Sequence, residues 1–403
     1  MVRPESSGLS GPRLQHIDRF IQEKYLDTGK LPCALTLVER NGHVAHSSAL
    51  GHMDLERKRP LQEDTIFRIY SMTKPLTSLA LMMLVEEGRI SLDDPVHRYI
   101  PQWRELGVYE GGFIGGFRTK RTSAPMRVVD LMRHTSGLTY GFQQRTNVDA
   151  AYRKLHLGEI PTAVSLEQMI DELAKVPLEF SPGSAWNYGI STDVVGYLVG
   201  KVSGQPFEQF LRSRILDPLG MTDTDFMVPA AKASRFAACY AATPKGGMVL
   251  QDDPQTSFFL KPPTFVSGGG GLVSTAADYL RFCRMLLNGG ELDGTRVVSR
   301  STIKLMTSDH LGTRVAAPFQ PGELLLGTPG YTFGLGFAVR QGDGVAGVSG
   351  SAGEFLWAGY AGTFFWVDPK EEIVGVYMTQ APSPIRAYYR RMFKSLVYQA
   401  LVD

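Results

Sequence analysis

The sequence predicts an α+β protein in which strands from both ends of the chain form one antiparallel sheet, flanked by helices. Strand-like runs occur at residues 33–51 and again from about residue 264 onward, whereas residues 91–259 alternate short helical patterns with Pro- and Gly-rich loops. A chain of 403 residues also exceeds one core of ordinary size. We therefore expect two packed domains, an α/β sheet domain of residues 1–90 and 260–403 and a mostly helical domain of residues 91–259.

The N-terminal part predicts a helix, a hairpin and a second helix. Apolar residues recur at helical spacing over residues 11–27. Residues 33–51 are typical of two strands joined at Asn41-Gly42, a pair that tolerates the positive φ of a tight turn. Residues 76–88 then form a helical pattern that is apolar on most sides, so we expect this helix to be buried between the domains.

The C-terminal part supplies the remaining strands and a last helix. Strand signals occur at residues 263–273 and 333–340, and residues 354–380 contain two β-rich runs joined by the turn VDPKEE. Residues 384–401 follow an amphipathic helical pattern. We expect its Arg390-Arg391 pair to lie on the solvated face.

Composition and charge exclude several classes of function. The net charge of +2 gives no electrostatic reason to expect nucleic acid or an anionic membrane as a partner. The three cysteines, Cys33, Cys239 and Cys283, are odd in number and widely spaced, so we expect buried thiols. The N-terminus lacks an apolar signal-peptide core, and no apolar run reaches the roughly 18 residues of a membrane span. These features predict a cytoplasmic protein.

Neither a metal nor a cofactor is expected. His43 and His46 are three residues apart on a strand and would face opposite sides of it. The run Gly268–Gly271 lacks the Lys-Ser/Thr of a phosphate-binding loop, and a close approach of backbone at a strand end explains it. The G-x-G-x-x-G match at 342–347 is followed by no helical pattern, so we interpret it as a turn.

The motif Ser-x-x-Lys occurs twice, and its context separates the two copies. Ser301 precedes a short helical stretch with Lys304 one turn on, which helix capping explains. Ser71 instead follows the strand-like run TIFRIY and begins the buried helix. Because residues i and i+3 share a helix face, Lys74 lies beside the Ser71 hydroxyl. Burial near a helix N-terminus disfavours the ammonium form, so Lys74 can take the serine proton.

Several segments together resemble one known family. The chain resembles the serine β-lactamase/penicillin-binding-protein-like superfamily, nearest its class C branch and the family VIII carboxylesterases. The resemblance extends over nearly the whole chain and keeps the family's order of segments. These are YSMTK (70–74), RHTSGL (133–138), PGSAWNYG (182–189), DPLGMTDTDF (217–226), GGGGLVSTAADYLRF (268–282) and LWAGYAGTFFWVDP (356–369).

The resemblance implies a β-lactamase/DD-peptidase-like fold and assigns site residues. Ser71 matches the nucleophile, Lys74 the adjacent base and Tyr188 the tyrosine of the second motif. Tyr188 beside Lys74 would share a proton with it as a coupled pair. By analogy, the backbone N–H groups of Ser71 and Tyr360 would form the oxyanion hole.

Two positions depart from the lactamase pattern. The second motif is normally Tyr-x-Asn, and Ile190 stands at its third place. The third motif is normally Lys/His-Thr-Gly, and here it is Trp357-Ala358-Gly359, as in the esterase branch. An indole cannot pair with the carboxylate of a β-lactam or peptidoglycan stem, so we expect a preference for neutral acyl esters.

The sequence therefore predicts a metal-free serine carboxylesterase for short-chain acyl esters, with β-lactam hydrolysis left open as a side activity. We expect Trp357, Gly359, Tyr140 and Phe142 to shape the substrate pocket. The alternatives are a β-lactamase or D-amino-acid peptidase, an acyltransferase to a bulky alcohol, and a non-catalytic binding protein on this fold. No G-x-S-x-G nucleophile elbow occurs, and His134 is expected to serve structure by hydrogen bonding in a loop. The oligomeric state is left open.

Overall fold

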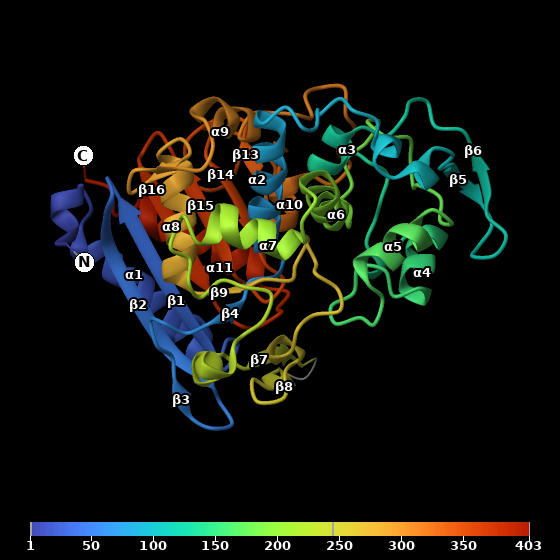
Figure 1. The fold of residues 1–403 in the computed structure, drawn as a ribbon. Helices are drawn as coiled ribbons and strands as arrows, with labels where there is room; N and C mark the ends of the chain where they lie inside the picture. Colours follow the sequence, from blue (N-terminus) through green and yellow to red (C-terminus); the bar gives the residue numbers. More distant parts are fainter. Residues whose placement is uncertain (1, 244–245, 403) are drawn as a thin grey trace.

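The computed structural model describes residues 2–243 and 246–402. Within these residues, eight strands form one antiparallel sheet in the order β12-β13-β14-β15-β16-β1-β2-β3. Its centre joins the two ends of the chain, because β1 pairs with β16 and Val38 lies opposite Gly375. Its strands are β1 (Cys33–Arg40), β2 (His43–Asp54), β3 (Arg59–Pro60), β12 (Tyr331–Phe333), β13 (Ala338–Arg340), β14 (Phe355–Ala358), β15 (Phe364–Asp368) and β16 (Ile373–Met378). The expected sheet from both chain ends is confirmed (Figure 1).

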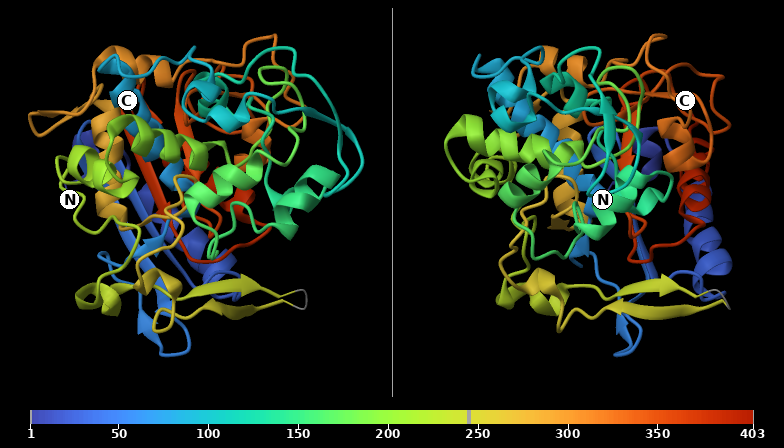
Figure 2. Two further views of the ribbon diagram at one scale, coloured as in Figure 1. Left: turned by 45° about the vertical axis from the view of Figure 1, so that its right-hand side comes forward. Right: turned by 90° about the vertical axis from the view of Figure 1, so that its right-hand side faces the viewer.

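Helices cover both faces of this sheet. Helix α8 packs on β15 and β16 from one side, and α1 and α11 lie together on the other (Figure 2). The helices are α1 (Gly11–Ile21), α2 (Thr73–Glu86), α3 (Val128–Met132), α4 (Asn147–Lys154), α5 (Leu166–Leu173), α6 (Ser191–Ser203), α7 (Phe207–Leu211), α8 (Ala276–Leu287), α9 (Arg300–Met306), α10 (Pro321–Leu326) and α11 (Arg386–Tyr398).

The segment inserted between the two halves of the sheet contains α3 to α7 and two hairpins. In Figure 1 its helices α4 and α5 and its first hairpin lie at the right, α7 crosses the middle, and the second hairpin lies at the bottom. Its hairpins are β5 (Val108–Gly111) with β6 (Arg118–Lys120), and β7 (Cys239–Ala242) with β8 (Met248–Asp252). Two further short pairs are β4 (Phe67–Arg68) with β9 (Val273–Ser274), and β10 (Glu291–Leu292) with β11 (Thr295–Arg296).

Helix α2 occupies the centre of the molecule. Every side chain from Thr73 to Leu84 is buried, and the helix packs against α6 and α7 of the inserted segment. At its N-terminal end, the hydroxyl of Tyr279 on α8 donates to the carbonyl of Met72 at 2.9 Å. The burial of α2 that its apolar composition predicts is confirmed. The N-terminal end of α2 lies between α8, which packs on the sheet, and the inserted segment.

Other local predictions divide between confirmed and corrected ones. Asn41 and Gly42 both have positive φ, at 53° and 76°, and join β1 to β2 as expected. The three cysteines are free and buried, as expected. Of residues 263–273, predicted as a strand, only Val273 enters one, β9, because the glycines before it form a turn. Residues 354–380 hold three strands where two were expected, because a turn at 359–363 divides the first apolar run.

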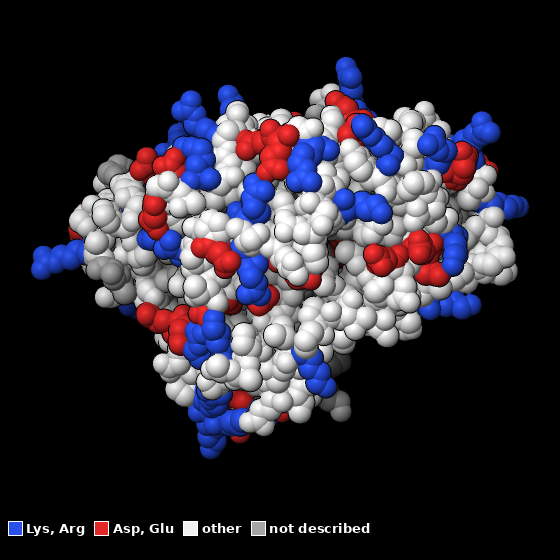
Figure 3. Space-filling view, in the orientation of Figure 1, with Lys and Arg blue, Asp and Glu red and all other residues white. Residues whose placement is uncertain are grey.

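Two predictions about surface residues need a correction. The N-cap of α9 is Ser299, whose hydroxyl accepts from the N–H of Thr302, so Ser301 is not the cap. Arg390 is buried, whereas the sequence placed it on a solvated face. Elsewhere on the surface, basic and acidic side chains are interspersed over the face shown in Figure 3.

Candidate active site

Ser71 lies on a strained turn between a short strand and α2. The pairing of β4 with β9 ends at Arg68, and residues Tyr70–Met72 then form one turn of 3-10 helix. Tyr70 has φ of 42°, in the left-handed region that a bulky side chain rarely adopts. Such a conformation costs about 1–3 kcal/mol and persists only where the surroundings impose it. The turn exposes Ser71 partly while Met72 and Lys74 are buried.

Lys74 is held by three acceptors. Its ammonium nitrogen lies 2.7 Å from the carbonyl oxygen of Gly269, 2.9 Å from the hydroxyl of Tyr140 and 3.2 Å from Ser71 Oγ. A lysine nitrogen can donate up to three hydrogen bonds, and these three oxygens are the acceptors at this buried position. The carbonyl of Gly269 gives the glycine run a function in the site that the sequence did not show.

Tyr188 completes the cluster around Ser71. Its hydroxyl donates to Ser71 Oγ at 2.6 Å, and its ring centroid lies 4.7 Å from Lys74 Nζ. Ser71 Oγ is therefore within hydrogen-bond distance of two groups that can move a proton. The structure brings Ser71, Lys74 and Tyr188 together, as the family resemblance implied, and adds Tyr140 beside them.

Tyr140 contacts Lys74 directly, whereas Phe142 lies at the surface. Burial raises the pKa of the Tyr140 phenol well above its usual value, and the neighbouring Tyr188 adds to the rise, so Tyr140 stays neutral and accepts from Lys74. Ile190 is fully buried and offers no polar atom to the lysine. Phe142 stacks on Tyr140 with ring centroids 4.8 Å apart, and its side chain is 66% exposed.

Asp193 is a buried carboxylate near the site that sequence reasoning missed. It accepts from the hydroxyl of Ser267 at 2.5 Å and from the N–H of Gly269 at 2.9 Å. Burial raises the pKa of this carboxyl, and the nearby Lys74 opposes the rise. Asp193 thus holds the N–H of Gly269, and the carbonyl of the same residue, in the next peptide group, binds Lys74. In sequence it is only an acidic residue in the first turn of α6, a common position for helix stabilisation.

His134 packs against the ring of Tyr188. Its ring centroid lies 5.2 Å from that of Tyr188, and its Nδ1 accepts from the N–H of Gly189 at 3.5 Å. Burial, aided by the charge of Lys74, lowers the pKa of His134 well below its usual value, so the ring is neutral at pH 7. These contacts fit the structural function expected for it.

The loop after β14 lies beside the turn that carries Ser71. The Trp357 ring is buried 5.4 Å from the Tyr188 ring. Gly359 lies against the carbonyl of Ile69, too close to admit a side chain, and the Tyr360 ring meets the Tyr70 ring edge-on at 5.6 Å. This arrangement places the Gly359–Tyr360 peptide next to the turn that carries Ser71.

The second Ser-x-x-Lys copy makes no comparable cluster. Ser301 and Lys304 are both exposed on α9, and the hydroxyl of Ser301 lies 2.8 Å from that of Ser299.

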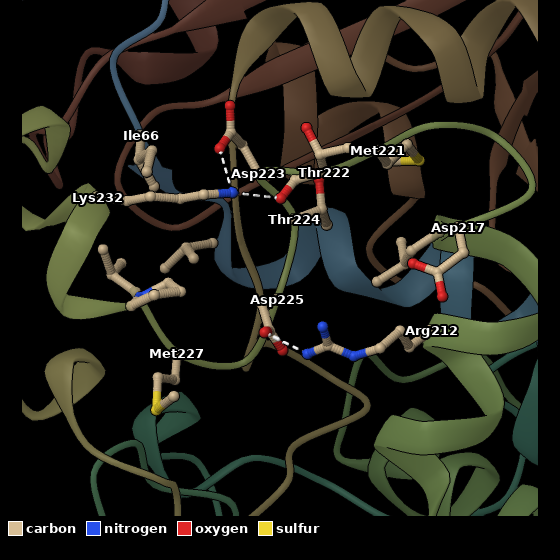
Figure 4. Close-up of a pocket in the computed structure, with 14 residues that line it drawn as sticks. Ile66, Arg212, Asp217, Met221, Thr222, Asp223, Thr224, Asp225, Met227 and Lys232 are labelled. Atoms are coloured by element: carbon tan, nitrogen blue, oxygen red, sulfur yellow. Dashed lines mark hydrogen bonds and ion pairs between the residues drawn. The ribbon is translucent and has the colours of Figure 1, made fainter.

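A separate cavity of about 110 Å³ is lined by none of the predicted site residues (Figure 4). Two of its basic side chains are paired there, Lys232 with Asp223 at 2.7 Å and Arg212 with Asp225. Because these pairs leave neither cation free, we assign the cavity no function.

Within the described residues, no group of three or more His, Cys, Asp or Glu side chains is arranged to hold a metal ion. No helix in those residues is long and apolar enough to cross a membrane.

Comparison with known proteins shows the family. The sequence model described as Beta-lactamase matches residues 17–396. The chain belongs to the β-lactamase family, and as a member of it is a serine hydrolase.

Individual relatives cover most of the chain. Protein Rv1367c of Mycobacterium tuberculosis is 36% identical over 360 residues, covering 88% of this chain and 87% of its own. Esterase EstB of Burkholderia gladioli is 31% identical over 359 residues, covering 84% and 83%. The solved structure of EstCE1, described as a hydrolase with promiscuous acyltransferase activity, superposes with a TM-score of 0.79 at 26% identity and covers 96% of this chain and 98% of its own.

Proposed function

We propose that the protein is a serine carboxylesterase of the family VIII type that hydrolyses short-chain acyl esters through an acyl-enzyme on Ser71. The observation that carries this proposal is the position of Ser71 Oγ, 3.2 Å from Lys74 Nζ and 2.6 Å from the Tyr188 hydroxyl. The similarity to Esterase EstB and to the hydrolase EstCE1 supports ester chemistry. The substrate is a small-molecule ester, and the cytoplasm is the location that the sequence predicts.

The first half-reaction acylates the enzyme. Ser71 Oγ attacks the ester carbonyl while its proton passes to the coupled pair of Lys74 and Tyr188, which accepts it in the form that carries one proton fewer than an ammonium and a phenol together. The carbonyl oxygen becomes negatively charged and is held by the backbone N–H groups of Ser71 and Tyr360. Tyr188 then donates a proton to the oxygen of the departing alcohol, and the bond between that oxygen and the acyl carbon breaks.

The second half-reaction frees the acyl group. A water molecule gives its proton to the same pair and attacks the acyl carbon, and the bond to Ser71 Oγ breaks as Ser71 regains a proton. The products are the carboxylic acid and the unmodified serine. One proton-transfer pair therefore serves both halves.

Aromatic side chains favour an apolar acyl group over a β-lactam. Trp357 is buried against Tyr188 at the place where lactamases carry a lysine, and it offers no charge to a substrate carboxylate. Tyr140, Phe142 and Gly359 complete the proposed pocket. Apolar acyl surface buried against the exposed Phe142 and the half-buried Tyr188 ring would contribute about 25 cal/mol per Å².

A second candidate is acyl transfer to an alcohol. It is favoured by the similarity to EstCE1, whose description includes promiscuous acyltransferase activity. The same acyl-enzyme would serve, with an alcohol replacing water in the second step. Adding an alcohol acceptor and measuring the ratio of new ester to free acid separates the two.

The test compares a short-chain p-nitrophenyl ester with a chromogenic cephalosporin. We expect the wild type to hydrolyse the ester, Ser71→Ala to lose this activity, and Ser301→Ala, the matched serine of the other motif, to keep it. Cephalosporin turnover far above ester turnover would overturn the assignment to esterases. Ester hydrolysis that survives in Ser71→Ala would show that another nucleophile acts.

A further inference from the structure

Arg390 is a buried cation that the proposed chemistry does not use. It lies on α11, and its side chain is 1% exposed. Its Nη2 donates to the carbonyl of Gly359 at 2.7 Å and to that of Thr363 at 3.2 Å, and its Nη1 reaches the carbonyl of Leu325 at 3.5 Å. Within the described residues, no ion pair links Arg390 to a carboxylate, so backbone carbonyls and the Phe364 ring, whose centroid lies 6.0 Å from the guanidinium carbon, stabilise the charge. Burial lowers the pKa of Arg390 to about 10.

This arrangement is expensive if Arg390 serves packing alone. Removing an ion from water costs several kcal/mol even after relaxation, and a nearby opposite charge is the usual compensation. An apolar side chain of similar volume would fill the same space without that cost. All three hydrogen-bond acceptors of the buried guanidinium are backbone carbonyls. We therefore look for the function of Arg390 in the orientation of those peptide groups.

One of these peptides is the one expected to bind the oxyanion. The carbonyl of Gly359 and the N–H of Tyr360 belong to the same planar trans peptide, so they point in opposite directions. A guanidinium bound to the carbonyl therefore fixes the direction of the N–H. On the other side of this loop, Gly359 lies against the carbonyl of Ile69 and the Tyr360 ring against Tyr70, next to the nucleophile.

Helix α11 holds both ends of this turn. Arg390 binds the carbonyls of Gly359 and Thr363, and these residues are also joined by the N–H of Gly359 donating to the carbonyl of Thr363 at 2.8 Å. The adjacent Tyr389 donates its hydroxyl to the carbonyl of Gly362 at 3.3 Å. The turn is thus anchored from α11, the face of the sheet opposite α8.

We propose that Arg390 is a positioning residue for the oxyanion hole, orienting and polarising the Gly359–Tyr360 peptide so that its N–H points at the carbonyl oxygen of the substrate. The inference rests on the proposed function. Charge-assisted hydrogen bonds are about twice as strong as neutral ones. A hydrogen bond to the carbonyl end of a peptide also strengthens donation by its N–H. The benefit is greatest when the oxyanion forms, so Arg390 acts on kcat and little on KM.

The test uses two variants and one matched control in the full-length protein. Arg390→Met removes the charge, and Arg390→Lys keeps it but loses the planar guanidinium, whose Nη2 binds the carbonyls of Gly359 and Thr363. Arg391→Met changes the neighbouring, partly exposed arginine, whose side chain lies over Tyr388. Circular dichroism and the melting temperature establish that each variant is folded.

We expect Arg390→Met to lower kcat for a p-nitrophenyl ester about 10- to 100-fold, below the loss of a whole oxyanion donor, with KM changed less than about 2-fold. Arg390→Lys should lie between it and the wild type, and Arg391→Met should match the wild type. A folded Arg390→Met with wild-type kcat would overturn the inference, as would a rise in KM that accounts for the whole loss. Should Arg390→Met fail to fold, the kcat of Arg390→Lys decides in the same way.

A second measurement separates this inference from the proposed function. A p-nitrophenyl phosphonate ester reacts once with Ser71: the O–P bond forms, p-nitrophenolate leaves, the serine proton passes to Lys74 and Tyr188, and the phosphoryl oxygen requires the oxyanion hole. The rate of p-nitrophenolate release should fall in both Arg390 variants whatever the natural substrate is. Absence of ester turnover in the wild type, with phosphonylation intact, would overturn the esterase proposal alone. Unchanged phosphonylation in folded Arg390 variants would overturn the positioning function alone.

Discussion

The hydroxyl of Tyr140 lies 2.9 Å from Lys74 Nζ and is the side-chain acceptor that the lysine has besides Ser71. In the family pattern an asparagine follows the catalytic tyrosine by two places, and here that place is the buried, apolar Ile190. Tyr140 therefore supplies the polar contact to Lys74 from a different element of the inserted segment.

Replacing Tyr140 by Phe should impair catalysis more than folding. The ring keeps its stacking on Phe142, but Lys74 loses one partner, and a hydrogen bond to a charged group contributes about 1.5–3 kcal/mol. We expect kcat to fall about 10- to 100-fold, measured with a p-nitrophenyl ester. Tyr99→Phe, which removes a hydroxyl bound to Asp94, is the matched control and should retain activity. A Tyr140→Phe variant as active as the wild type would show that Lys74 does not need this contact.

Replacing Gly359 by Ala should remove activity by a steric route. A methyl group there would overlap the side chain of Thr363 and the carbonyl of Ile69. The loop must then move away from the turn of Ser71, and a displacement of about 1 Å can cost 100-fold in rate. Gly344→Ala is the control, because its added methyl group would meet nothing within 4 Å. Comparable losses in both variants, measured as kcat/KM, would contradict this account.

The fold was largely predictable because its signals are local. The helical period of residues 11–27, the turn at Asn41-Gly42 and the apolar helix after Ser71 each depend on residues close in the chain. The turn at 359–363 was missed because its residues, GYAGT, lie inside a run of apolar and aromatic residues. The burial of Arg390 was missed because Arg390 and Arg391 were assigned to one face of the helix. Adjacent residues lie about 100° apart on a helix, so the two arginines point in different directions.

The site was predictable only in part. The spacing of Ser71 and Lys74 is local, and the position of Tyr188 came from the family resemblance. The remaining partners of Lys74 are tertiary, since Tyr140 is 66 residues away and Gly269 is 195 residues away. Asp193 acts through Gly269 from a third element. No periodicity or spacing in the chain encodes such contacts, so only the structure assigns them.

Removing one member of the buried ion pair behind the sheet should destabilise the fold strongly. Lys394 and Glu354 are both fully buried, 2.8 Å apart, and the hydroxyl of Tyr331 donates to the same carboxylate at 2.5 Å. Lys394→Met leaves Glu354 with the more distant Arg340, 3.6 Å away, as its remaining cation, so we expect a cost of about 3 kcal/mol, the lower end for a broken buried pair. Urea unfolding measures this change in the free energy of unfolding.

The control for this prediction is an exposed pair. Lys370 and Asp343 lie 3.8 Å apart with both side chains 63% exposed, so Lys370→Met should change stability by about 0–1 kcal/mol. The double variant Glu354→Gln/Lys394→Met removes both charges of this pair and should recover part of the loss. Arg340, which lies 3.6 Å from Glu354, keeps its hydrogen bonds to backbone carbonyls there. Equal effects of Lys394→Met and Lys370→Met would refute the assignment of a buried, structural pair.

Acid should destabilise the protein through its buried histidines. Burial lowers the pKa of His134 well below its usual value, and it lowers those of His46 and His310 as well. The histidines of the unfolded chain therefore bind protons near pH 6.5, whereas those of the folded protein remain neutral at that pH. Stability is complete above that pH and is lost as pH falls toward the folded pKa, by about 1.4 kcal/mol per pH unit for His134, whose pKa is lowered the most clearly. Urea unfolding of the wild type between pH 8 and pH 5 measures this slope.

His134→Asn, whose amide oxygen can still accept from the N–H of Gly189, should flatten the slope of stability against pH. His43→Asn, at an exposed position, should leave the slope unchanged. A His134→Asn protein with the full wild-type slope would show that His134 takes up its proton without unfolding.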